Sequence, residues 1–168
     1  SLFWSLPNLY PTWVGTEDFY FSFLNESRWN NPVQQVGEGV LEPSGEKLIF
    51  TTSDEGHQTT ILPWKENLPK SESWYVEALL SVPGTHESGD LSTAGIFFCL
   101  NDLPTYNGDG FRIRLENTQL TGSVTRRLIF EESIGEEVYS YYDQSMTVQD
   151  SFVRVKLQYL HTAKMLIF

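Results

Sequence analysis

The sequence predicts an all-β domain built from antiparallel strands in two packed sheets. Three observations lead to this prediction. Apolar and polar residues alternate at every second position wherever a pattern is legible, which is typical of half-buried strands. Short segments rich in Gly, Pro, Asp and Asn separate these runs and are typical of turns. No segment combines a helical period with capping residues, so about ten strands in one domain favour a two-sheet sandwich or barrel.

Three segments, 74–82, 110–116 and 152–159, alternate most clearly. Each is predicted to be an antiparallel strand with one apolar face on the core and one polar face in water. Glu77 and Glu116 lie in or at the end of such strands, and we expect both to be solvated. The predicted core-facing residues are Trp74, Val76, Ala78, Leu80, Val82, Phe111, Ile113, Leu115, Val153, Val155, Leu157 and Tyr159.

Residues 94–100 are apolar at successive positions, which predicts a strand covered on both faces. This strand holds Cys99, the single cysteine, which we expect to be buried and inert. No repeat or linker interrupts the chain, so residues 1–168 are interpreted as one domain. Weaker strands are predicted near 19–23, 39–42, 47–52, 58–62, 123–131, 137–142 and 163–168.

Charge and composition exclude several classes of function. The formal net charge of −11 argues against binding to nucleic acid or to an anionic membrane surface. The longest apolar runs have about seven residues, so the sequence predicts no membrane span. A single cysteine cannot form an intramolecular disulfide, which favours the cytosol, whereas Asn25-Glu26-Ser27 is a glycosylation acceptor triplet that favours the secretory route.

The order of the strand segments carries a family resemblance. FYFSF (19–23) is followed by GEGVLEPSGEKLIFTT (37–52), SWYVEALLSVPG (73–84), STAGIFFCLND (92–102), YNGDGFRIRLEN (106–117), SFVRVKLQY (151–159) and TAKMLIF (162–168). This order resembles the concanavalin A-like lectin/glucanase superfamily and is most similar to the L-type, legume-like lectin domains of secretory-pathway cargo receptors. The resemblance implies a jelly-roll sandwich that recognises glycans or glycoproteins in the secretory pathway lumen or outside the cell.

The sequence departs from this family in three places. Ala94 stands where the family's GDG motif has its Asp, and an alanine methyl cannot accept a hydrogen bond from a sugar. Residues 116–119, at the position of the family's calcium ligands, offer oxygens but not the expected Asp. We therefore expect a degraded sugar site and no cofactor, with calcium left as the one alternative. Family domains also continue past the strand that matches 162–168, so we expect a fragment, or a sheet completed by a partner or a further chain.

Four polar residues are the candidate ligand-binding set: Asp102, Asn107, Asp109 and Asn117. Short carboxylate and amide side chains beside glycines suit a sugar-contacting loop or a cation site, although a plain turn is the alternative. Aromatic side chains can also pack against the C–H faces of sugar rings, and the alternative for each is packing within the protein. The aromatic candidates are Trp64, Trp74, Tyr139, Tyr141 and Tyr142.

No catalytic arrangement is evident. The E-x-D-x-x-E spacing of the glucanase relatives and the G-x-S-x-G nucleophile motif do not occur, and His57, His86 and His161 have no partners at metal-binding spacing. The sequence therefore predicts a non-enzymatic, lectin-like domain. Two alternatives remain open. One is a protein-interaction or assembly domain that lost sugar binding, and the other is a glycoside hydrolase relative with two carboxyl groups about 5–9.5 Å apart.

Overall fold

The structure is a computed structural model that describes residues 19, 23–51, 58–82, 91–99, 108–120, 123–147 and 152–168. These residues form strands and turns and no helix, and accordingly none of them builds a membrane-crossing helix. The strands are β1 (Val33–Val36), β2 (Val40–Pro43), β3 (Leu48–Thr51), β4 (Thr59–Ile61), β5 (Trp74–Leu80), β6 (Leu91–Cys99), β7 (Gly110–Leu120), β8 (Ser123–Ile134), β9 (Glu137–Met146), β10 (Val153–Leu160) and β11 (Met165–Ile167).

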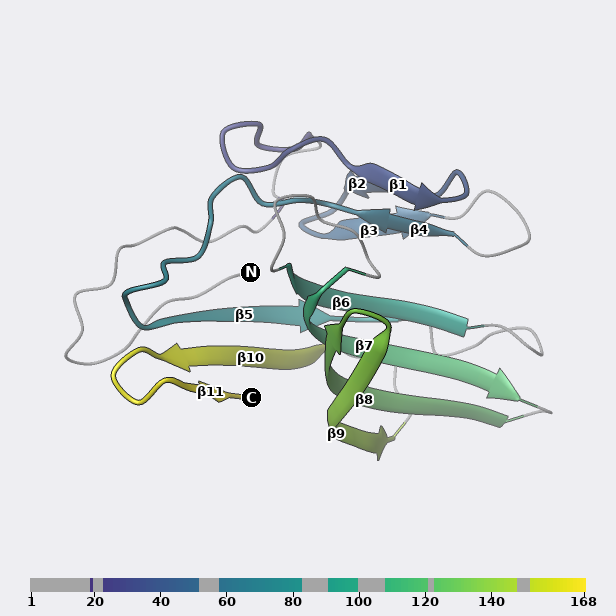
Figure 1. Ribbon diagram of the computed structural model, residues 1–168. Helices are drawn as coiled ribbons and strands as arrows, with labels where there is room; N and C mark the ends of the chain where they lie inside the picture. The colour runs from purple at the N-terminus through teal and green to yellow at the C-terminus, as the bar shows by residue number, and fades with distance from the viewer. Residues whose placement is uncertain are drawn as a thin grey trace.

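All strand pairs are antiparallel, as predicted, and they form four sheets (Figure 1). The largest sheet has the order β6-β7-β8-β9, and its neighbours are also consecutive in the chain. A second sheet has the order β11-β10-β5, so β10 returns to pair with a strand from much earlier in the sequence. Two pairs, β1-β4 and β2-β3, complete the described strands.

The three-stranded and four-stranded sheets share one hydrophobic core. Trp74 and Leu80 of β5 and Leu157 of β10 belong to the same buried cluster as Ile113 and Leu115 of β7. Burial of one such side chain stabilises a fold by about 1.5–3 kcal/mol, so these residues provide much of the cohesion between the two sheets. The alternation in 74–82, 110–116 and 152–159 thus predicted the core positions correctly, although Val76, Ala78, Phe111, Val153 and Tyr159 are only partly buried.

The weaker predictions were confirmed for β2, β3, β4, β8, β9 and β11, whereas 19–23 lies largely outside the described residues. The prediction missed β1, because its sequence VQQV has too few apolar positions to show a pattern. Residues 94–99 form most of β6, but the burial expected on both faces is incomplete. In the described part of the chain β6 is an edge strand of its sheet, so the Cys99 side chain is half-buried rather than buried.

The polar face of β7 contradicts the sequence prediction. Arg112 and Glu116 are buried, although the alternation predicted that this face is solvated. The register explains the burial: Arg112 lies opposite Glu131 and Glu116 lies opposite Arg127, so charged side chains from neighbouring strands cover each other. Glu77 is also mostly buried, with Arg154 as its ion-pair partner on β10.

Candidate functional site

A β-bulge on the β8–β9 hairpin gathers three tyrosines on one side of the sheet. Residues that lie directly opposite each other in an antiparallel pair point to the same face. Phe130 and Glu132 share a face of β8, and they lie opposite Tyr142 and Tyr139, respectively. Tyr139 and Tyr142 therefore share that face, although regular alternation would place residues three positions apart on opposite faces. The register shifts between Phe130 and Glu131, where Tyr141 is the extra residue on β9.

Tyr141 joins the same surface through its contacts. Its ring centroid lies 5.7 Å from that of Phe130, and its hydroxyl donates a hydrogen bond of 2.5 Å to Glu132 Oε2. The exposed fractions of Tyr139, Tyr141 and Tyr142 are 47%, 59% and 40%, so all three rings are accessible to a ligand. We call Tyr139, Tyr141 and Tyr142 the tyrosine surface.

Carboxylates orient two of the three phenol groups. Tyr139 donates to Glu137 Oε2, and Tyr141 donates to Glu132 Oε2. These hydrogen bonds are the main reason that the pKa of each tyrosine is raised above its ordinary value of 10.0, with smaller contributions from desolvation and from the charge of Glu132. Both tyrosines therefore remain protonated donors at neutral pH. A carboxylate has about four lone-pair sites, so Glu132 and Glu137 can accept further hydrogen bonds from a ligand.

Packing against other aromatic rings supports two side chains of the tyrosine surface. Phe130 belongs to the core, and its ring contacts Phe111, Tyr141 and Phe168 at centroid distances of 6.0, 5.7 and 5.0 Å. Tyr142 contacts Phe168 edge-on at 5.3 Å. Aromatic pairs of this kind contribute about 0.5–1.5 kcal/mol each beyond their buried area. The rings of Tyr141 and Tyr142 are thus packed against other aromatic side chains of the fold.

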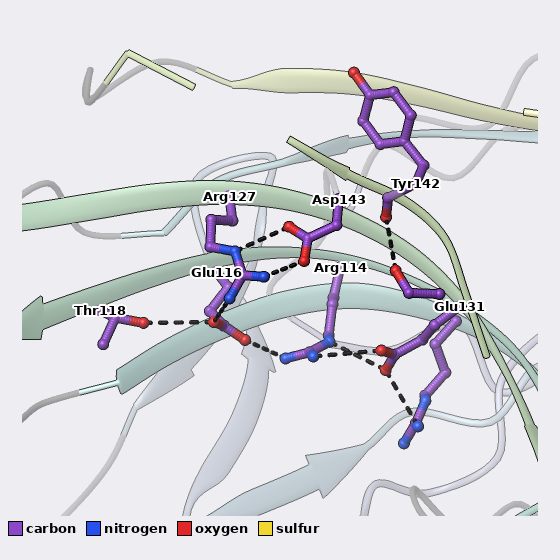
Figure 2. A network of polar contacts seen from close by, with 9 residues as sticks. Arg114, Glu116, Thr118, Arg127, Glu131, Tyr142 and Asp143 are labelled. Carbon is purple, nitrogen blue, oxygen red and sulfur yellow. Dashed lines mark hydrogen bonds and ion pairs between the residues drawn. The ribbon is translucent and has the colours of Figure 1, made fainter. Parts of the chain in front are cut away.

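The opposite face of the same sheet carries a ladder of alternating charges, which Figure 2 shows from close by. Its members, in spatial order, are Arg112, Glu131, Arg114, Glu116, Arg127 and Asp143. We call this set the charge ladder. It crosses β7, β8 and β9, and in Figure 2 the Tyr142 ring points away from it.

The charge ladder is best ordered at its buried end. Glu131 Oε1 lies 3.1 Å from Arg112 Nη2 and 3.2 Å from Arg114 Nε. Arg114 also pairs with Glu116, which accepts a weaker 3.4 Å hydrogen bond from Thr118 Oγ1. At the exposed end, Arg127 binds Asp143 through two nitrogens, and this hydrogen bonding raises the pKa of the guanidinium.

The charge ladder is suited to holding the sheet together. Each of its carboxylates accepts hydrogen bonds or ion pairs from one or more arginines, so its charges are largely satisfied within the protein. In the described residues, no group of three or more His, Cys, Asp or Glu side chains is arranged to hold a metal ion.

Two of the four sequence-predicted ligand residues, Asp102 and Asn107, lie outside the described residues. Asp109 Oδ1 accepts a 2.6 Å hydrogen bond from the backbone N–H of Gly135, in the turn between β8 and β9. Asp109 therefore lies at the end of the hairpin that carries the tyrosine surface. Asn117 is fully buried, and its Oδ1 accepts a 3.0 Å hydrogen bond from Arg126 Nε. Asn117 thus has no surface to offer a ligand in this conformation.

The aromatic candidates separate clearly by environment. Trp74 belongs to the core, and Trp64 packs edge-on against Trp29 at 4.7 Å. Of these candidates, Tyr139 and Tyr141 combine high exposure with a hydroxyl oriented by a carboxylate. Of the histidines, His161 lies in the turn before β11 next to Lys164, whereas His57 and His86 are outside the described residues.

Comparison with protein-family models, with curated proteins and with solved structures gives no match in any of the three. The resemblance to lectin domains therefore stays a prediction from the strand order.

The sequence suggested the tyrosines but not their grouping. The segment VYSYY contains the three rings, yet its alternation places Tyr139 and Tyr141 on one face and Tyr142 on the other. Only the bulge brings Tyr142 to the same side. The charge ladder was missed as well, although the alternation of Arg and Glu on β7 and β8 was a usable signal.

Proposed function

We propose that this chain is a non-catalytic, lectin-like β-sandwich domain of concanavalin A-like, jelly-roll type, and that its tyrosine surface contacts glycans or glycoproteins. The observation that carries the proposal is the grouping of three exposed rings with two hydroxyls oriented by carboxylates. Flat apolar ring faces suit the C–H faces of sugars, and the neighbouring hydroxyl and carboxylate oxygens suit sugar hydroxyls.

The proposed place of action is the secretory pathway lumen or the extracellular space. The acceptor triplet at Asn25 supports this location. Asn25 and Ser27 are exposed in a turn, and the Ser27 hydroxyl donates a 2.6 Å hydrogen bond to Asn25 Oδ1. An exposed triplet of this kind is accessible to glycosylating enzymes.

The test is a glycan array with the folded chain, probed with calcium and again with a chelator. The contacts proposed for the tyrosine surface are ring stacking and hydrogen bonds, which need no metal ion, so we expect binding that is indifferent to chelation. Replacing Tyr139, Tyr141 and Tyr142 together by Ala should weaken binding by roughly tenfold or more, because the stacking surface is lost. The variant Phe152→Ala is the matched control, since Phe152 is equally exposed but lies near Lys47 instead of glutamates.

Three outcomes would count against the proposal. Binding that disappears with the chelator would indicate a calcium site elsewhere in the chain. Equal loss in the Phe152 control would indicate a general loss of folding. Release of reducing sugar from a bound glycan would support the glycoside hydrolase alternative.

A second function, protein interaction or assembly, is favoured by one observation. In the described part of the chain β9 is an edge strand, and nearly all of its side chains are exposed. An exposed edge offers unpaired backbone groups to a strand from a partner. A chain that binds no glycan but forms a complex dependent on β9 would favour this function.

A further inference from the structure

We propose that the tyrosine surface selects glycans by charge: it accepts neutral sugars, binds amino sugars that carry a free ammonium group more tightly, and rejects uronate and sulfate sugars. This inference rests on the proposed function and specifies its ligand class. It follows from the sign and position of the charges around the three rings.

The hairpin segment 130–142 contains four glutamates and no lysine or arginine. Glu131 points into the charge ladder, where Arg112 and Arg114 neutralise it. The other three, Glu132, Glu136 and Glu137, are not in the charge ladder, and two of them bind the tyrosine hydroxyls directly. The surroundings of the tyrosine surface are therefore negatively charged.

The nearest cations along β8 do not compensate this charge. Arg126 is six positions from Glu132 along β8, about 20 Å away, and its buried side chain is directed to Asn117 and the backbone oxygen of Val82. Arg127 points to the other face, where Asp143 binds it. The chain as a whole carries a net charge of −11, which adds repulsion of the same sign at longer range.

A ligand on the tyrosine surface therefore meets ring faces and hydrogen-bond acceptors with negative charge. Sugar hydroxyls and ammonium groups donate hydrogen bonds to Glu132 and Glu137 without repulsion. A sugar carboxylate or sulfate has no proton to donate at neutral pH and is repelled by both glutamates. The same stacking surface thus discriminates between glycans that have similar shapes and different charges.

The experiment compares three oligosaccharides of equal length by calorimetric titration: an N-acetylglucosamine oligomer, a glucosamine oligomer and a galacturonate oligomer. We expect the galacturonate oligomer to bind about tenfold more weakly than the neutral one. The glucosamine oligomer should bind more tightly than the neutral one at about 0.01 M salt. This advantage should shrink at about 1 M salt, where the screening length falls from about 30 Å to about 3 Å.

Variants assign the effect to the hairpin. The double variant Glu132→Gln/Glu137→Gln keeps the shape and the acceptor oxygens, so it should still bind the neutral oligomer and lose most of the charge preference. The matched control is Glu38→Gln/Glu42→Gln, which removes two exposed glutamates from the region of β2 and should leave the preference unchanged.

The two proposals fail in different ways. If no oligomer binds and arrays also give no signal, the proposed glycan function is wrong and this inference with it. If the neutral and anionic oligomers bind equally well, the charge selection is wrong while glycan binding stands. A preference that survives in the double variant would likewise overturn the role of Glu132 and Glu137.

Discussion

Glu131 and Glu132 are neighbours on β8, yet they belong to opposite faces of the sheet and to different environments. Glu131 is only 6% exposed and lies between two arginines of the charge ladder. Glu132 is half-buried and accepts a hydrogen bond from an exposed tyrosine. The same side chain thus stabilises the sheet at one position and helps to form a candidate binding surface at the next.

Glu131 and Glu132 differ in what compensates the negative charge of each carboxylate. A buried carboxylate requires compensation, because removing it from water costs several kcal/mol. Three arginines provide that compensation along the charge ladder. On the side of the tyrosine surface, water solvates the glutamates and leaves part of their hydrogen-bonding capacity available. The charge ladder is therefore expected to govern stability, and the tyrosine surface is expected to govern recognition.

The largest expected effect is at the buried glutamate. Glu131→Ala leaves Arg112 and Arg114 partly uncompensated and should lower the free energy of unfolding by about 3 kcal/mol. Glu132→Ala should lower it by less than about 1 kcal/mol, because water replaces the exposed contact. Urea denaturation of both variants measures the difference. Equal losses in the two variants would contradict the separation of roles.

A smaller effect is expected at the exposed end of the charge ladder. Arg127→Gln breaks the pair with Asp143, which is partly in water, and should cost less than about 1 kcal/mol. Arg114→Gln, nearer the buried end, should cost more. Denaturation in about 1 M salt sharpens the comparison, because screening should reduce the loss at Arg127 and leave most of the loss at Arg114. If Arg127→Gln lowered the free energy of unfolding more than Arg114→Gln, burial would not determine how much each ion pair of the charge ladder contributes to stability.

The smallest effect concerns the protonation of the tyrosine surface. The pKa values of Tyr139 and Tyr141 are raised in the folded chain, so their hydrogen bonds to carboxylates stabilise it below about pH 10. That contribution is lost as the pH rises through the raised folded-state values. A tyrosinate absorbance titration should show two late-titrating groups on this surface. Glu132→Gln should lower the pKa of Tyr141 toward 10, and an unchanged titration would rule out the contact.

The sequence alone predicted the parts of the fold that depend on local patterning. Alternation identified the core positions Ile113, Leu115 and Leu157, because a strand with one buried face requires an apolar residue at every second position. The same reasoning failed for Arg112 and Glu116. An alternating polar residue indicates which face it occupies but not whether a charged neighbour on the next strand covers it.

Residue patterning was enough to predict antiparallel strands around an apolar core, and acidic and aromatic residues occur together in 130–142. The directions in which those side chains point depend on how the strands pair. The bulge at Tyr141, opposite Phe130 and Glu131, turns Tyr142 to the side of Tyr139, and the register places Glu131 between two arginines. Strand register is set by the pairing of one strand with the next and not by the pattern within either strand, and a one-residue shift moves every following side chain to the opposite face.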